Sequence, residues 1–502
     1  PKSHWFNLNA SILPGLLAAL SAGLLSDALG QSEPASITTA VATLCVFWWI
    51  FEPIPIPVTS LVPMGVLPLL GVITPADVAA AYGSPLILLL MGGFLLSKGM
   101  ESTGAHTRIA ITVVRFVGAN EPKRLILGFM LAAALLSMWI SNTATVLMLL
   151  PVALAVIATS SAPTALAPPL LLGLAWACSI GGLGTPIGTP PTLIFMQVYE
   201  ETTGTAVSFS EWMTWGIPVV ALMVPTIAIF LARQVPNALT VDLPDIGGWR
   251  SAEKRVLIVF AATAVAWMTR TEPFGGWRVW FDMPMANDAA VAFCAVVAMF
   301  ITRDKSGEPL ISWEQASAIP WGVLLLFAGG ITLAKGFVSS GLSAQVGELL
   351  AGLALVPTLL AIVVVAALVT ALTEATSNTA TTALLMPILA AASMAAQIDP
   401  MILMVPAAMS ASCAFMLPVQ TCHLMTSTTL LSVHTKVTSS SALLAPSAPC
   451  DRHVVASATN MTPHVEMPLS ILLPCWPQKF ELVAIIDDLY VLLLEEWSLQ
   501  CV

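Results

Sequence analysis

The sequence predicts an all-α polytopic membrane protein, built from two inverted repeats that contain re-entrant hairpins and broken helices. Hydrophobic residues make up 57% of the chain and charged residues only 9%, whereas soluble domains contain roughly 25% charged residues. Apolar runs long enough to span or to enter the hydrocarbon core recur from Ile12–Leu29 to Ile402–Val419. One polar pentapeptide also occurs twice, each time inside such a run.

The apolar runs and the duplicated motifs divide the chain into five parts. Residues 1–35 are expected to form an N-terminal helix. The first repeat covers residues 36–235, the second covers residues 256–419, and residues 236–255 link them. Each repeat is predicted to contain scaffold helices, a hairpin and a broken helix. Residues 420–502 form a tail of different composition.

Each repeat contains an apolar, glycine-rich segment with the same small and polar residues at matching offsets. Leu88–Gly104 and Leu324–Gly341 both contain a Gly-Gly pair, a Lys-Gly pair, a serine and a final glycine. So many positions in register indicate an internal duplication. Because glycine allows close backbone approach, each segment is predicted to be a hairpin that enters and leaves on one side. The alternative is that the glycines only help helices to pack.

The pentapeptide Ser-Asn-Thr-Ala-Thr follows in each repeat, as Ser141–Thr145 and as Ser377–Thr381. These side chains compete with helical backbone bonds, so each long apolar run is predicted to break here. Ser137 and Thr373 each precede the first serine by one helical turn, on the same helix face. We expect both copies to converge on one polar site near the bilayer midplane. Alternatively, the hydroxyls only make contacts between helices.

A broken helix offers backbone N–H groups to an anion at one end and carbonyl groups to a cation at the other. A further irregular segment is predicted at Gly181–Pro191, which is rich in glycine and proline and cannot continue an α-helix. Its counterpart in the second repeat begins at Ala414–Val419. The two repeats should therefore present several unwound segments to one site.

Four kinds of motif occur together in this chain: the two Ser-Asn-Thr copies, Gly184–Pro191, Glu52–Pro57 and Ile319–Leu326. In this combination the chain resembles the divalent anion:sodium symporter family over about residues 10–419. The resemblance implies sodium-coupled uptake of dicarboxylates, tricarboxylates or sulfate by an elevator mechanism. It also implies a homodimer in the plasma (inner) membrane, in which scaffold helices hold mobile transport domains.

The resemblance further implies which residues bind the ions and the anion. The first sodium site is expected to use Ser137, Ser141, Asn142 and the backbone near Gly188. The second is expected to use Thr373, Ser377, Asn378 and the backbone near Gln420. The anion is expected to lie between Ser141, Asn142 and Thr143 on one side and Ser377, Asn378 and Thr379 on the other, with Thr189 nearby.

The residue types in these clusters favour symport. No Lys or Arg lies within either pentapeptide, so bound cations and helix dipoles must neutralise a dianion. Exchangers of the family replace the sodium sites with cationic side chains, and none occurs at these positions. The expected substrate is a C4-dicarboxylate such as succinate, or citrate. The alternatives are a sulfate or oxyanion symporter, or an inactive remnant.

The sequence favours a transporter over an enzyme. No CxxC, HExxH or GxSxG motif occurs, so zinc chemistry and a nucleophile elbow have no support. The sequence contains no run of Lys and Arg that would indicate a nucleic-acid partner. The expected partners are a divalent anion, sodium ions and the lipid bilayer, with no cofactor other than the coupling ions.

The chain departs from the family pattern at Gln420. Family members continue with Ala-Thr-Pro-Pro-Asn, whereas this chain reads Gln420–Thr426 as Gln-Thr-Cys-His-Leu-Met-Thr. Codons for these residues, read in another frame, permit Pro-Pro-Asn at the family's position. We therefore expect a single-base slip near Gln420, which would remove part of the second sodium site. The alternative is a genuine, diverged C-terminus.

Overall fold

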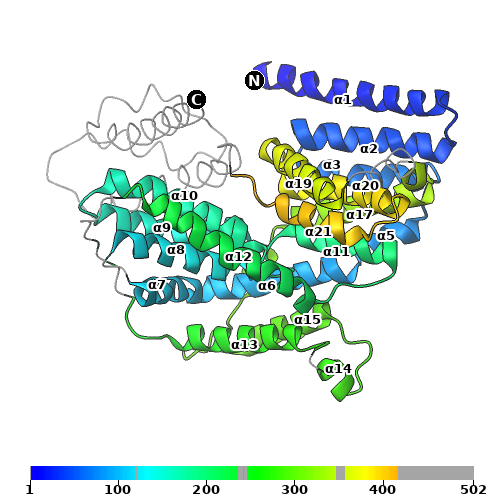
Figure 1. Ribbon diagram of the computed structural model, residues 1–502. Helices are drawn as coiled ribbons and strands as arrows, with labels where there is room; N and C mark the ends of the chain where they lie inside the picture. The colour runs from blue at the N-terminus through cyan, green and yellow to red at the C-terminus, as the bar shows by residue number, and fades with distance from the viewer. Residues whose placement is uncertain are drawn as a thin grey trace, which may run out of the picture. The chain divides into compact units, whose positions relative to one another are not determined.

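A computed structural model describes residues 2–118, 121–235, 241, 243, 246–272, 274–345 and 357–415. Within these residues the chain is helical, and the only strand-like pairing is one isolated bridge between Arg303 and Pro309. In the described part of the chain, six helical segments are long and apolar enough to cross a membrane: Glu33–Phe51, Pro75–Thr103, Pro163–Gly182, Phe209–Ala232, Trp321–Ser339 and Asn378–Ala395. The predicted all-α polytopic fold is confirmed (Figure 1).

The helices of the first repeat and of the segment before it are α1 (Lys2–Ala28), α2 (Glu33–Phe51), α3 (Ile56–Thr59), α4 (Leu61–Leu69), α5 (Pro75–Tyr82), α6 (Pro85–Thr103), α7 (Ala105–Val117), α8 (Pro122–Ser137), α9 (Asn142–Ala158), α10 (Pro163–Gly182), α11 (Pro190–Thr203) and α12 (Phe209–Ala232). Those that follow are α13 (Ser251–Met268), α14 (Gly276–Trp280), α15 (Asp288–Ile301), α16 (Trp313–Ser317), α17 (Trp321–Ser339), α19 (Thr358–Ala375), α20 (Asn378–Ala395) and α21 (Pro400–Ser410).

Both pentapeptides interrupt a helix, as predicted. In the first repeat α8 ends at Ser137 and α9 begins at Asn142. The Ser141 side chain caps α9 by accepting a hydrogen bond from the Ala144 N–H at 3.3 Å. In the second repeat α19 ends just before Thr376, and α20 begins at Asn378. In the first repeat this serine satisfies an N–H group that the helix end leaves unpaired, so the break and the new helix start are favoured together. The Ser377 side chain makes no such cap bond.

The glycine- and proline-rich segment is unwound, also as predicted. Residues Leu183–Thr189 separate α10 from α11 and contain no α-helix. The Thr185 hydroxyl donates a short hydrogen bond to the Met138 carbonyl, which lies in the break between α8 and α9. The two irregular segments of this repeat therefore support each other. In the second repeat the helix α21 ends at Ser410, and the residues from Ala411 to Phe415 are likewise non-helical.

The hairpins predicted inside Leu88–Gly104 and Leu324–Gly341 are not there. Each segment lies mostly in one continuous helix, α6 or α17, and that helix has no break within the segment. A β carbon on Gly92 would overlap that of Ala292, and one on Gly329 would overlap the Ser60 backbone. The glycines thus allow close helix packing. The alternative interpretation of these glycines was the right one.

These close contacts join the two halves of the chain reciprocally. Helix α6 of the first repeat packs against α15 and α13 of the second, while α17 of the second repeat packs against α3, α4 and α5. Helix α11 of the first repeat also packs against α20 and α21 (Figure 1). Each repeat is therefore held partly by helices of the other.

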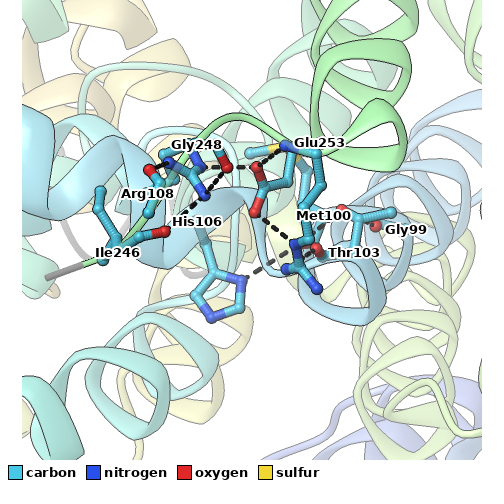
Figure 2. A network of polar contacts seen from close by, with 10 residues as sticks. Gly99, Met100, Thr103, His106, Arg108, Ile246, Gly248 and Glu253 are labelled. Carbon is cyan, nitrogen blue, oxygen red and sulfur yellow. Dashed lines mark hydrogen bonds and ion pairs between the residues drawn. The ribbon is translucent and has the colours of Figure 1, made fainter.

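A cluster of three charged residues, Arg108, Arg250 and Glu253, connects the start of α13 to the junction of α6 and α7 (Figure 2). Arg108 Nε lies 2.6 Å from a carboxylate oxygen of Glu253, and both side chains are almost fully buried. Arg108 also donates to the carbonyl groups of Ile246, Gly247 and Gly248 at 2.8–2.9 Å. Arg250 pairs with the second carboxylate oxygen of Glu253 at 2.8 Å and donates to the Thr103 carbonyl at 2.7 Å.

Replacing Glu253 with alanine should destabilise the protein by about 3–5 kcal/mol, because it leaves the Arg108 guanidinium buried without its counter-charge. The midpoint of thermal unfolding of the detergent-solubilised protein measures this loss. Glu121→Ala is the matched control, since it removes an ion pair with Arg124 in which both side chains are 61% exposed. Exposed pairs contribute at most about 1 kcal/mol. Equal shifts for the two variants would contradict the structural role of the buried cluster.

Candidate functional site

One cavity brings the two pentapeptides together. It has a volume of about 950 Å³ and is lined by residues of both repeats. All seven residues predicted to bind the anion line it: Ser141, Asn142, Thr143, Thr189, Ser377, Asn378 and Thr379. Gly188, predicted for the first sodium site, lines it too. Gln420 lies outside the described residues.

Three helix N-termini lie at this cavity. The first residues of α9, α11 and α20 are among its lining, together with their N-cap residues Ser141, Thr189 and Ser377. The N-terminal turn of a helix carries unpaired N–H groups and about half a positive charge. Helices α9 and α20 therefore offer N–H donors to a bound anion, whereas α11 begins with two prolines and contributes only the positive end of its dipole.

The predicted residue Ser137 lies behind the cavity wall and is fully buried. Its hydroxyl oxygen is 2.7 Å from the amide oxygen of Asn142 and 2.7 Å from the carbonyl oxygen of Cys178, in α10. A hydroxyl has one proton, so it donates to only one of these acceptors at a time. Three oxygen atoms thus gather with one proton among them.

The second repeat has the same arrangement. The Thr373 hydroxyl, also fully buried, lies 2.8 Å from the amide oxygen of Asn378 and 2.9 Å from the carbonyl oxygen of Ala411. Ala411 directly follows α21, which pairs with α19 as α10 pairs with α8. Two oxygen clusters of equal composition therefore lie beside the two helix breaks.

A further oxygen lies close to the first cluster, at a position where there is no room for a β carbon. A β carbon built on Gly182 would lie 2.6 Å from the Asn142 amide oxygen and 3.1 Å from the Gly188 carbonyl oxygen. These two oxygens therefore face a common point that only a glycine leaves open. Gly188 is itself confined, because a β carbon there would lie 2.9 Å from the Met138 carbonyl oxygen.

Comparison with known proteins gives the family. The model of the citrate transporter family matches residues 46–409. The chain belongs to this transporter family. The match confirms the motif-based assignment to the divalent anion:sodium symporters, and the protein is a transporter of the plasma membrane rather than an enzyme.

Curated relatives resemble the transporter over most of its length. The sodium-dependent dicarboxylate transporter SdcS of Staphylococcus saprophyticus is 38% identical over 444 residues, which cover 84% of this chain and 85% of that protein. The protein of the same name from Staphylococcus aureus is 39% identical over 410 residues, 77% of each chain. Among solved structures, the Alcanivorax borkumensis YdaH transporter aligns with a TM-score of 0.49 and 14% identity, over 72% of this chain and 82% of that one.

Two serines that line the transporter's cavity were not predicted from the sequence. Ser179 and Ser412 line the cavity, and each directly follows a carbonyl group that faces a buried hydroxyl, at Cys178 or Ala411. The Ser412 hydroxyl lies 3.3 Å from that of Thr189 and so joins the two repeats across the site. Alignment of the helices that follow each pentapeptide would have revealed this pair.

The cavity wall also carries charge, which the sequence analysis did not expect. Lys98 and Glu101 of α6 line it, and so does Glu52, which follows α2. In the sequence, Lys98 belongs to the glycine-rich segment that marks the repeat, and Glu52 belongs to a motif shared with the family. Neither lies near a pentapeptide in the sequence, and the helix packing alone brings them to the site.

Proposed function

We propose that this transporter carries C4-dicarboxylates such as succinate across the plasma membrane together with sodium ions. The observation that carries the proposal is the pair of oxygen clusters, in each of which a buried hydroxyl faces an amide oxygen and a backbone carbonyl oxygen. A cation placed between the oxygens would relieve their mutual repulsion. Relatives named as sodium-dependent dicarboxylate transporters support the same ion and the same substrate class.

The donor atoms suit sodium. Hydroxyl, amide and backbone carbonyl oxygens are hard ligands that favour hard cations over transition metals. In the first site we assign Ser137, Ser141, Asn142 and the Gly188 carbonyl to the ion. In the second we assign Thr373, Ser377, Asn378 and the backbone near Gln420, the last of which lies outside the described residues.

The anion would lie in the cavity between the two pentapeptides. Ser141, Asn142 and Thr143 would face one carboxylate and Ser377, Asn378 and Thr379 the other, with Thr189 beside them. Two bound sodium ions and three helix N-termini would then offset the two negative charges. The family resemblance extends the proposal to an elevator movement and to a homodimer. Cross-linking in native membranes can test the homodimer.

Citrate is the second candidate, since the matching family model is that of a citrate transporter. The cavity of about 950 Å³ falls within the usual 300–1,000 Å³ range of small-molecule sites and does not select between the two anions by size. Sulfate uptake, or no uptake, would instead favour the oxyanion carrier or the inactive remnant.

The first test is uptake of radiolabelled succinate by protein reconstituted in liposomes. Uptake should require a sodium gradient and should fail when potassium or choline replaces sodium. Citrate and sulfate are tested as competitors at equal concentration. The chain as given is compared with a version whose reading frame is restored from codon 420 onward, because an out-of-frame tail would leave only the restored version active. Proton-driven uptake in sodium-free buffer would refute the sodium assignment.

Gly182→Ala should raise the sodium concentration for half-maximal uptake by about tenfold or abolish uptake, because its methyl group occupies the space between the Asn142 and Gly188 oxygens. The matched control is Gly65→Ala. Gly65 is exposed within α4 and has no atom within 4 Å of the added carbon. Equal sodium dependence of the two variants would contradict a sodium ion at this place.

Thr373→Val should weaken sodium binding in the second site, because it removes the hydroxyl and keeps the shape. Loss of one ligand is expected to raise the sodium requirement by about tenfold and to reduce the Hill coefficient. Thr373→Ser keeps the hydroxyl and should behave like the wild type. A serine variant as impaired as the valine variant would indicate a packing role instead.

A further inference from the structure

One face of α6 borders the cavity. Phe94, Ser97, Lys98 and Glu101 all line it, and their spacing of three, four and seven residues places them in one stripe along the helix. The stripe carries one ammonium and one carboxylate. It comes from a helix that lies outside both pentapeptides, so it is a separate wall of the same cavity.

The opposite face of α6 is fixed by packing. Gly92 and Gly99, seven residues apart, lie against Ala292 and Met299 of α15, which are also seven residues apart. A β carbon on Gly99 would lie 2.5 Å from the Met299 sulfur. Because this face cannot rotate without a clash, the charged stripe stays directed toward the cavity.

The charges on the cavity wall do not balance. Lys98 Nζ lies 2.7 Å from a Glu101 carboxylate oxygen, and the side chains are 28% and 40% exposed. Glu52 adds a second carboxylate from the end of α2. Among the described residues that line the cavity, Lys98 is the only Lys or Arg. Without it, an entering anion would face two uncompensated carboxylates.

We propose that Lys98 is a specificity-determining residue, whose ammonium offsets Glu101 and attracts the anion into the cavity in proportion to the anion's charge. The inference rests on the proposed function of the cavity. The Lys98 side chain is partly exposed and lines the cavity, so its ammonium can turn from Glu101 toward a carboxylate of the substrate. Coulomb attraction grows with the charge of the ligand, so a dianion gains more from Lys98 than a monoanion does.

The second repeat offers a matched control. Lys335 of α17 occupies the position that Lys98 has in α6, since both follow a Gly-Gly pair at the same distance. Lys335 does not line the cavity, and the position equivalent to Glu101 is Val338. Lys335→Gln removes the same charge from an equivalent helix position but leaves the cavity wall unchanged.

The experiment measures succinate uptake kinetics in liposomes at saturating sodium, using the version of the protein that transports. Lys98→Gln should raise the KM for succinate by about tenfold with little change in kcat. Lys98→Arg should keep the wild-type KM. The double variant Lys98→Gln, Glu101→Gln should have a KM close to that of the wild type.

A second measurement compares inhibitors of different charge. In Lys98→Gln, inhibition by monomethyl succinate, a monoanion, should weaken less than inhibition by malonate, a dianion. Added choline chloride should shrink the difference between Lys98→Gln and the wild type.

A KM for Lys98→Gln equal to that of the wild type or of Lys335→Gln would overturn the proposal. So would an arginine variant as impaired as the glutamine variant, or equal losses for monoanion and dianion, because each would indicate packing rather than charge. Wild-type protein that takes up no succinate would refute the proposed function itself. Wild-type uptake with an unaffected Lys98→Gln would refute this inference alone.

Discussion

Each half of the site depends on one buried hydroxyl that faces an amide oxygen and a carbonyl oxygen. Ser137 reaches Asn142 five residues later, and Thr373 reaches Asn378 over the same interval. In a continuous helix, residues five apart lie about 140° apart around the axis and cannot touch in this way. The contact therefore requires the helix break, and the break delivers the N-terminus of α9 or α20 to the cavity. The spacing of four residues predicted that each hydroxyl shares a helix face with the first serine of the pentapeptide. In the structure, each hydroxyl instead contacts the asparagine that follows this serine.

The close glycine contacts decide what surrounds these breaks. Helix α6 is held against α15 by Gly92, and α17 is held against the α3–α4 junction by Gly329. The packing is reciprocal between the repeats, so neither repeat forms the cavity alone. The buried pair of Arg108 and Glu253 adds a second link between α7 and α13. A protein assembled in this way places side chains that are distant in sequence on one wall.

This interdependence explains which features could be predicted from the sequence. The helix breaks and the unwound segment follow from local chemistry, because hydroxyls, glycines and prolines compete with helical hydrogen bonds wherever they occur. The hairpin prediction was wrong because a Gly-Gly pair in a long apolar run is compatible both with a turn and with a close helix crossing. Only the residue packed against the glycine decides between the two, and here that residue is Ala292 or Ser60. Lys98 and Glu52 could not be assigned to the cavity because tertiary packing alone brings them there. Ser179 and Ser412 were within reach of an alignment of the two repeats.

We propose that coupling between cation and anion runs through Asn142 and Asn378. Each asparagine lines the cavity and also faces a buried hydroxyl in an oxygen cluster, so one side chain borders both kinds of site. Without a cation, the clustered oxygens would repel one another and would weaken the positive potential that the helix N-termini give to the cavity. A cation bound there would hold the asparagine, fix the helix N-terminus beside it and restore that positive potential. By thermodynamic linkage, an anion bound in the cavity must then tighten cation binding by the same factor. The shared asparagines therefore give sodium coupling a physical basis that needs no direct contact between the two ligands.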